Sequence, residues 1–283
     1  MNRTSLLDAF RSPMAAAALS FLAVVAAISA FAPLLAPCDP EAVDMGNRLA
    51  PFSLSHPLGT DHLGRDVLSR LLHGGRHTLL LALAASAATM AIGLALGIVS
   101  GYFGGFADDA IQWFVQLFQG LPGLSFMLAI AGTLGPGAAS LFIAVVITSW
   151  ADFSRIVRGE TLKLREEHYV EAVRAMGSGH GRIMLRHLMP NLLGPIVVLF
   201  TVRIGRTMLA IASLSFLGLG LQPPLPDWGV MVSDARTYFR SYPHLMILPG
   251  MCIAAVSLAI NLLGDALRDG WDARTERNGE EWR

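Results

Sequence analysis

Two arginines inside an apolar segment are the sharpest chemical signal in this sequence. Arg203 and Arg206 lie one helical turn apart, so they share a face, and both fall within the apolar stretch 192–221. A charge at that depth is costly in a membrane and usually faces a bundle interior or a water-filled path. We expect either an anion-attracting lining of a translocation path or a structural role. The structural role would be a pair with Asp152 or with a partner-subunit carboxylate, or snorkelling to the interface.

Nucleotide hydrolysis is excluded as an activity of this chain itself. A phosphate-binding loop needs the pattern G-x-x-x-x-G-K-[ST], and the only lysine is Lys163, in the sequence ETLKLRE. The pattern G-x-S-x-G of serine hydrolases is also missing, so we expect Ser213 and Ser215 to hydrogen-bond to backbone or to a neighbouring helix. The chain is therefore expected to be no enzyme and to bind no cofactor itself.

The histidines and cysteines form no recognisable metal-binding pattern. His73 and His77 are one helical turn apart and His56 and His62 lie nearby, yet no carboxylate or cysteine cluster completes a ligand set at ligand spacing. The two cysteines are too few for a disulfide scaffold and too far apart for a metal knuckle. We expect surface or interface histidines, apolar thiols and no metal site.

The composition identifies an integral membrane protein. Of the 283 residues 53% are hydrophobic and 15% are charged, against about 25% charged in a typical soluble domain. A spanning helix needs about 20 mostly apolar residues. Stretches that meet this length with little or no charge lie at residues 12–38, 78–106, 110–134, 192–221 and 245–264, and a shorter one lies at 138–151. We expect an all-α membrane protein with six transmembrane helices.

The basic residues predict the orientation of the chain. Cytoplasmic loops carry an excess of Arg and Lys, and the excess here falls at both termini and in the 155–190 loop. At the termini these residues are Arg3, Arg11, Arg268, Arg274, Arg277 and Arg283. Both termini are therefore expected inside (N-in, C-in), although the short loop at Asp108 and Asp109 has no basic residue. A formal net charge of +0 gives no reason to expect a nucleic-acid partner.

Two further loops are then expected on the outer side. In residues 39–77, helical spacing is followed by Val67, Leu68, Leu71 and Leu72. We expect a short interfacial helix with Asp61 as its N-cap and a break at Gly74-Gly75. The prolines of QPPLPDW, residues 222–228, prevent a helix, and its tryptophan suits the membrane–water interface. This loop could meet a soluble partner, form a gate or be a stiff surface turn. Its candidate residues are Gln222, Pro223, Pro224 and Trp228.

The segment EAVRAMGSGHGRIMLRHLMP, residues 171–190, predicts two short helices on the cytoplasmic side, separated by a break at Gly177-Ser178-Gly179. An apolar face on such a loop needs a partner to cover it, so we expect the chain to receive motion from another protein. The residues concerned are Glu171, Ala172, Val173, Ala175, Met176, Gly177 and Pro190.

Four stretches resemble the inner-membrane permease subunits of binding-protein-dependent ABC importers, in the dipeptide, oligopeptide and nickel group. They are HPLGTDHLGRDVLSRL (56–71), the 171–190 segment, SFLGLGLQPPLPDWGVM (215–231) and INLLGDALRDGWD (260–272). In that family the 171–190 segment is the EAA motif, a coupling helix that docks in a groove of the ATPase. Glu171, Ala172 and Gly177 match the pattern, and Pro190 ends it as expected. Val173 replaces the second alanine, and Met189 stands where leucine is usual.

The resemblance implies a type I ABC importer permease fold in the bacterial cytoplasmic (inner) membrane. Its regions would be 1–77 with the first helix and outer loop, a five-helix core at 78–264, and a cytoplasmic tail at 265–283. The implied partners are a homologous second permease, two ABC ATPases that use ATP and Mg, and an extracytoplasmic solute-binding protein. Peptides are the expected substrate, with nickel or a metal chelate as the alternative. An ion-coupled secondary transporter is the alternative of another class.

Overall fold

The fold is known from a computed structural model, which describes residues 12–280, with side chains described as far as residue 269. Some of the arginines that predicted the orientation lie outside the described residues, namely Arg3, Arg11 and Arg283. The side chains of Arg274 and Arg277 are not described either. Over the described range the chain forms helices and connecting loops, without a β-strand. Its α-helices are α2 (Pro13–Ala30), α3 (Ala32–Leu35), α4 (Val67–Phe103), α5 (Gly105–Gly120), α6 (Gly123–Leu134), α7 (Ala138–Arg165), α8 (His168–Ala175), α9 (His180–Ile183), α10 (Met189–Leu214), α11 (Trp228–Ala235) and α12 (His244–Glu280).

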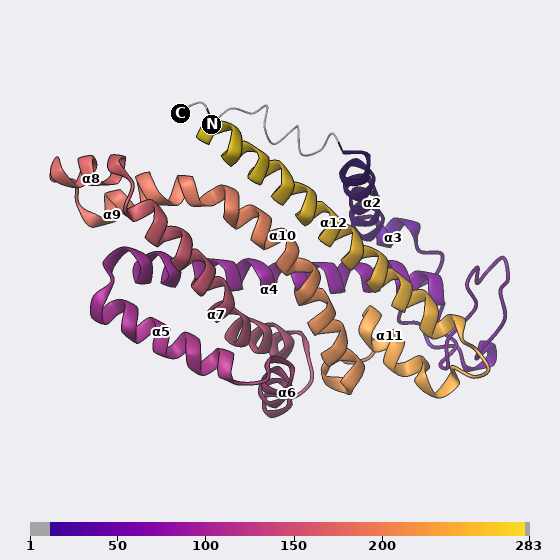
Figure 1. The fold of residues 1–283 in the computed structure, drawn as a ribbon. Coiled ribbons are helices and arrows are strands. Elements are labelled where there is room, and N and C mark those ends of the chain that lie inside the picture. Colours follow the sequence, from indigo (N-terminus) through magenta and orange to yellow (C-terminus); the bar gives the residue numbers. More distant parts are fainter. Residues whose placement is uncertain (1–11, 281–283) are drawn as a thin grey trace.

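The long helices run between two ends of the molecule (Figure 1). The short helices α8 and α9 lie at one end, together with the end of α4 and the start of α10. At the other end, α11 lies with the connection between α3 and α4. The segments expected on the two sides of the membrane are therefore found at opposite ends.

Five helices or helical stretches are long and apolar enough to cross a membrane, and a bent pair raises the number to six if it counts as one span. The expected span at 110–134 is interrupted: α5 and α6 meet at a bend of 90°, and the pair supplies the sixth span where it counts as one. Pro122 explains the break, because a residue that precedes proline is disfavoured in the helical region, and Leu121 is extended (φ −93°, ψ 140°). The short stretch 138–151 proves to be the first half of α7, a helix of 28 residues.

The closest helix contact is a seam of small residues between α4 and α7. Gly93, Gly97 and Gly101 lie four residues apart on α4, and a Cβ atom on each would fall 2.6–2.7 Å from the Cβ atom of Phe153, Val157 or Thr161 respectively. The two backbones can approach this closely only because glycine has no side chain. In a membrane such close packing is a main source of helix association.

The start of α4 differs from the sequence-based expectation. Asp66, not Asp61, is the N-cap: its side chain accepts a hydrogen bond from the Ser69 N–H at 2.7 Å. The helix continues through Gly74 and Gly75 to Phe103, a length of 37 residues. Gly75 remains helical because it makes room for another part of the chain, the Trp228 ring, whose Cζ2 lies 2.7 Å from the position of a Cβ. The expected separate interfacial helix is therefore the first part of a spanning helix.

The acidic corner between α4 and α5 is neutralised from α7. Arg158 donates two hydrogen bonds to the Asp108 carboxylate, from Nε at 2.6 Å and from Nη2 at 2.5 Å. The Ser100 hydroxyl donates to the same carboxylate at 2.5 Å. A bidentate arginine–carboxylate pair of this kind is both strong and directional. It ties α5 to α4 and α7, and it pairs the negative charge of a corner that lacks basic residues of its own.

We predict that Gly97→Ala destabilises the folded chain by about 1–3 kcal/mol, because a methyl group in a tightly packed seam forces the helices apart. Thermal unfolding of the purified protein in detergent measures the effect. Gly159→Ala is the matched control: this glycine lies on α7, and nothing lies within 4 Å of the position of its Cβ. Equal unfolding temperatures for the two variants would contradict the seam.

Candidate functional site

One face of α8 is anchored in the molecule and the other is free. Val170 is fully buried in an apolar cluster with Tyr102 from the end of α4, Ile183 from α9 and Leu188 just before α10. The exposed side of the segment carries residues that the sequence singled out, and Met176 is 76% exposed. These exposed residues are Glu171, Ala172, Ala175, Met176 and Gly177, whereas Val173 is half-buried against the anchor.

Gly177 ends α8 in a turn that glycine makes easily. Its φ is +79°, in the left-handed region that costs other residues roughly 1–2 kcal/mol. The Ser178 N–H donates to the Val173 carbonyl at 3.3 Å and the Gly177 N–H to the Arg174 carbonyl at 3.0 Å. This pair of hydrogen bonds is the Schellman motif, which satisfies the last carbonyls of a helix. The expected break at Gly177 is therefore present.

The second half of the 171–190 segment differs from the expectation. Pro190 does not end a helix: α9 continues through a π-helical turn, Met184–Leu188, directly into α10. The π-helical turn lies directly before this proline, which is the second residue of α10. A bond of 2.9 Å between the Tyr102 hydroxyl and His180 Nδ1 fixes the segment to the end of α4.

A cavity of about 870 Å³ lies between α7, α10 and the second half of α12. Its walls are partly apolar, but charged side chains of both signs line it: Asp152, Glu160, Lys163, Arg203, Arg206, Asp265 and Arg268. The volume exceeds that of many small-molecule sites. Both arginines of the apolar stretch thus reach the same water-accessible space.

Within this cavity the two arginines differ. Arg203 binds Asp152 with both terminal nitrogens at 3.2 Å and donates to the Ser149 carbonyl at 2.6 Å. It therefore makes the pair with Asp152 that was one of its alternatives. Gln119 from α5 donates to the same carboxylate at 3.0 Å. Arg206 is exposed and has no ion pair with the side chains described up to residue 269.

The QPPLPDW loop holds α11 against the start of α4. Trp228 is buried, against the expectation that it lies at the membrane interface; its Nε1 donates to the Leu71 carbonyl at 2.8 Å, and its ring fills the space above Gly75. Asp227 caps α11 through the Val230 N–H at 3.0 Å and accepts from the Thr78 hydroxyl at 3.0 Å. Burial raises the pKa of Asp227 above its ordinary value, although these hydrogen bonds oppose the shift.

The rest of this loop is exposed at Gln222, Pro223 and Pro224. The loop is thus pinned at its end by Asp227 and Trp228 and open at its beginning. The sequence singled out Trp228 as an interface residue, whereas the structure buries it in the fold. Nothing in the sequence indicated that Asp227 is a buried helix cap.

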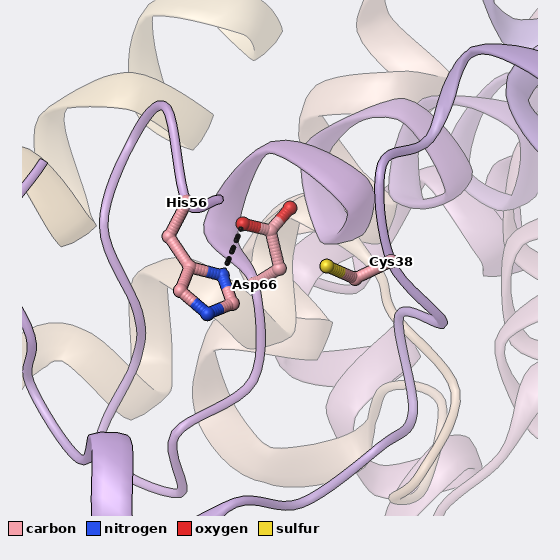
Figure 2. A group of neighbouring side chains, drawn as sticks. All are labelled: Cys38, His56 and Asp66. Carbon is pink, nitrogen blue, oxygen red and sulfur yellow. Dashed lines mark hydrogen bonds and ion pairs between the residues drawn. The ribbon is translucent and has the colours of Figure 1, made fainter. Parts of the chain in front are cut away.

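No spacing in the sequence indicated a ligand cluster, but the fold brings three potential ligands together. Cys38, His56 and Asp66 lie together in the outer loop, and their ligand atoms all fall within 4.8 Å of one another (Figure 2). His73 and His77 make other contacts: their Nδ1 atoms lie 3.0 Å from the Ser69 carbonyl oxygen and 2.9 Å from that of Pro226.

Comparison with known proteins now gives the family. Residues 93–277 match the family described as the binding-protein-dependent transport system inner membrane component. This chain belongs to that family. Residues 6–51 match a second family, the N-terminal TM domain of oligopeptide transport permease C. The expected multi-pass location in the inner membrane is thereby confirmed, and the secondary-transporter alternative is wrong.

Curated relatives agree with the permease family over nearly the whole chain. The glutathione transport system permease protein GsiD of Pectobacterium atrosepticum is 41% identical over 93% of this chain and 88% of its own length. The dipeptide transport system permease protein DppC of Alkalihalophilus pseudofirmus is 38% identical over 87% and 81%. Permeases of ABC transporters lack an ATPase site of their own, in accord with the missing phosphate-binding loop.

Solved structures confirm the fold of the permease. The inward-facing MetNI methionine ABC transporter matches with a TM-score of 0.57 at 17% identity, over 72% of this chain and 97% of that chain. An amino acid ABC transporter crystallised with histidines matches with a TM-score of 0.55 at 17% identity, over 70% and 92%. The permease therefore has the type I ABC importer fold that was expected.

We predict that Trp228→Phe destabilises the permease by about 1 kcal/mol, the usual net contribution of one hydrogen bond, because a phenyl ring cannot donate to Leu71. Trp228→Ala should cost about 3–5 kcal/mol through the cavity it leaves. Thermal unfolding in detergent distinguishes the two. Trp113→Phe is the control, at a tryptophan that is 61% exposed, and it should leave the unfolding temperature unchanged. A shift as large as that of Trp228→Phe would contradict the stabilising role of the Trp228–Leu71 hydrogen bond.

Proposed function

We propose that this permease forms half of the translocation path of an ATP-driven importer of short peptides. Its partners would be a homologous second permease, two ABC ATPase subunits and an extracytoplasmic solute-binding protein, all in or at the bilayer of the cytoplasmic membrane. The observation that carries the proposal is the free face of α8, held on a buried anchor at one end of the molecule. The identity to glutathione and dipeptide permeases supports the substrate class.

In this proposal α8 is the coupling helix. Its exposed residues Glu171, Ala172, Ala175 and Met176 enter a groove of an ATPase subunit, and Gly177 permits the sharp turn that lets the segment protrude. Val170 and Val173 pass the movement to α4 and α10 through Tyr102, Ile183 and Leu188, which share their cluster. ATP and Mg act at the partner ATPases, and this chain binds neither.

The charged cavity supports a substrate with a carboxylate. Because Asp152 already neutralises Arg203, Arg206 is the residue that would attract an anionic group. A carboxylate is present in every free peptide, whereas a bare metal cation would be repelled by the guanidinium groups at this point. These relatives give the nickel alternative no support.

The 222–228 loop would act as a gate next to the binding protein. Its exposed beginning, Gln222, Pro223 and Pro224, can change its contacts without disturbing Asp227 and Trp228, whose hydrogen bonds hold α11 on α4. The gate would therefore move about a fixed end.

We predict that Ala172→Arg lowers both ATP hydrolysis by the reconstituted complex and peptide uptake at least about tenfold, because a long charged side chain at the centre of a packed contact costs more than about 1.4 kcal/mol. The amount of permease in the membrane should not change, since Ala172 is exposed. Ala42→Arg, an exposed alanine in the outer loop at the other end, is the control and should hydrolyse ATP normally. Unchanged hydrolysis by Ala172→Arg would refute the coupling role of α8.

We predict that Arg206→Gln raises the KM for a peptide with an acidic side chain several-fold, and that for a neutral peptide less. One charge at a water-accessible site contributes on the order of 1 kcal/mol. Uptake of the two peptides by proteoliposomes gives both values. Arg203→Gln is the comparison: it leaves Asp152 without its partner and should lower thermal stability, which Arg206→Gln should not. An identical change of KM for both peptides would exclude Arg206 from charge recognition.

A further inference from the structure

Three potential metal ligands of different chemical type converge in the outer loop at the start of α4 (Figure 2). Cys38 follows α3, His56 lies in the loop, and Asp66 is the N-cap of α4. His56 Nδ1 and Asp66 Oδ1 are 3.0 Å apart. The imidazole is 19% exposed and the carboxylate is fully buried, so an ion could reach the group from one side only.

Local hydrogen bonds already hold these three residues in place. The Ser69 hydroxyl donates to Asp66 Oδ2 at 2.7 Å and accepts from the Cys38 N–H at 3.1 Å, so one side chain positions two of the three. The Ser53 hydroxyl accepts from the His56 N–H at 3.0 Å. Because the bonds of Asp66 to Ser69 use Oδ2, Oδ1 remains directed toward His56.

We propose that Cys38, His56 and Asp66 bind one Zn²⁺ ion or a similar borderline divalent cation, with water as the fourth ligand. Thiolate, imidazole and carboxylate are the three side-chain ligands of zinc, and their bond lengths of about 2.0–2.3 Å place tetrahedral ligands roughly 3.3–3.8 Å apart. The present separations, from 3.0 Å to within 4.8 Å, approach this geometry, and adjustments of the side chains by about 1 Å would reach it. Hard cations such as Mg²⁺ avoid sulfur, which excludes them here.

The charges of the site explain why the cysteine is essential. The N-terminus of α4 carries a partial positive charge, which opposes a dication, so both a carboxylate and a thiolate are needed to offset it. Binding forms the Sγ–Zn bond and releases the thiol proton to water. Zinc takes the place of the hydrogen between Nδ1 and Oδ1, and the neutral imidazole changes to the tautomer that carries its single proton on Nε2.

The Cys38 thiol lies next to a carboxylate. Burial, and next to it the negative charge of Asp66, raise the pKa of this thiol, so a metal ion has to displace its proton. Other charged groups near the start of α4 are Arg65, Arg70 and Asp61, which already pair with one another.

A bound ion would cross-link the outer loop. It would join the end of α3 and the loop around His56 to the start of α4. Arg65, next to Asp66, forms an ion pair with Asp234 of α11 at 3.6 Å. A ligand that binds only the folded state stabilises it by mass action. The bound ion would thus cross-link the outer end of the permease, which lies opposite the end that carries α8.

The test is metal titration of the complete transporter, purified with a tag that contains no histidine and stripped with a chelator. Co²⁺ replaces Zn²⁺ as the probe, because a sulfur-to-cobalt absorption band reports the thiolate bond directly. We expect one equivalent of Co²⁺ to produce this band in the wild type, and Zn²⁺ to abolish the band and to raise the unfolding temperature. Cys38→Ser should remove the band, and His56→Gln should raise the Kd at least about tenfold.

Two controls and one conservative variant keep the test decisive. Cys252→Ser and His62→Gln remove a cysteine on α12 and an outer-loop histidine stacked on Tyr238; both should bind Co²⁺ as the wild type does. Asp66→Asn retains a good N-cap residue and should fold but bind more weakly. Absence of the band in the wild type, or its persistence in Cys38→Ser, would overturn the proposal.

Discussion

The close contact between α4 and α7 is the constraint on which the rest of the molecule depends. Lipid tails are as apolar as leucine side chains, so burial alone gives spanning helices little reason to associate, and tight packing of small residues has to supply it. Gly93, Gly97 and Gly101 bring the backbone of α4 against α7 over two turns. Because the contacts occur at the level of Cβ atoms, a small shift of one helix along the other brings these atoms into closer contact. We therefore expect the pair to move as one unit.

Both functional ends are attached to this unit. The first turns of α4 carry the Asp66 cap and receive Trp228, while its last turn contributes Tyr102 to the anchor of α8. Ion pairs extend the unit sideways from α7: Arg158 holds α5 through Asp108, and Asp152 holds α10 through Arg203. A charge in a membrane is retained only when it is paired or functional. That rule accounts for these four residues. Of the two arginines in the apolar part of α10, it leaves Arg206 as the one that faces the cavity without an ion pair to the side chains described up to residue 269.

The sequence predicted what depends on composition and on local pattern. Apolar length located the spans, and the glycine of residues 171–190 predicted the turn at Gly177. Features decided by distant residues were missed. Gly74-Gly75 looked like a break because local propensity favours one, yet Trp228 packs there and the helix continues. Likewise Cys38, His56 and Asp66 are far apart in sequence, so no spacing pattern could reveal a cluster that a loop assembles.

The rigidity of the α4–α7 pair determines where the proposed switching can take place. Two states of a transporter must differ in contacts that its partners can favour, and the seam offers only one arrangement. The movable parts are then the neighbours of the pair. π-Helical turns, Met184–Leu188 and Ser215–Leu219, bracket α10 at its two ends, and such turns often mark functional positions in helices. Movement of α8 would therefore act on α10, and with it on Arg206 and the cavity, while α4 keeps the outer clamp in place.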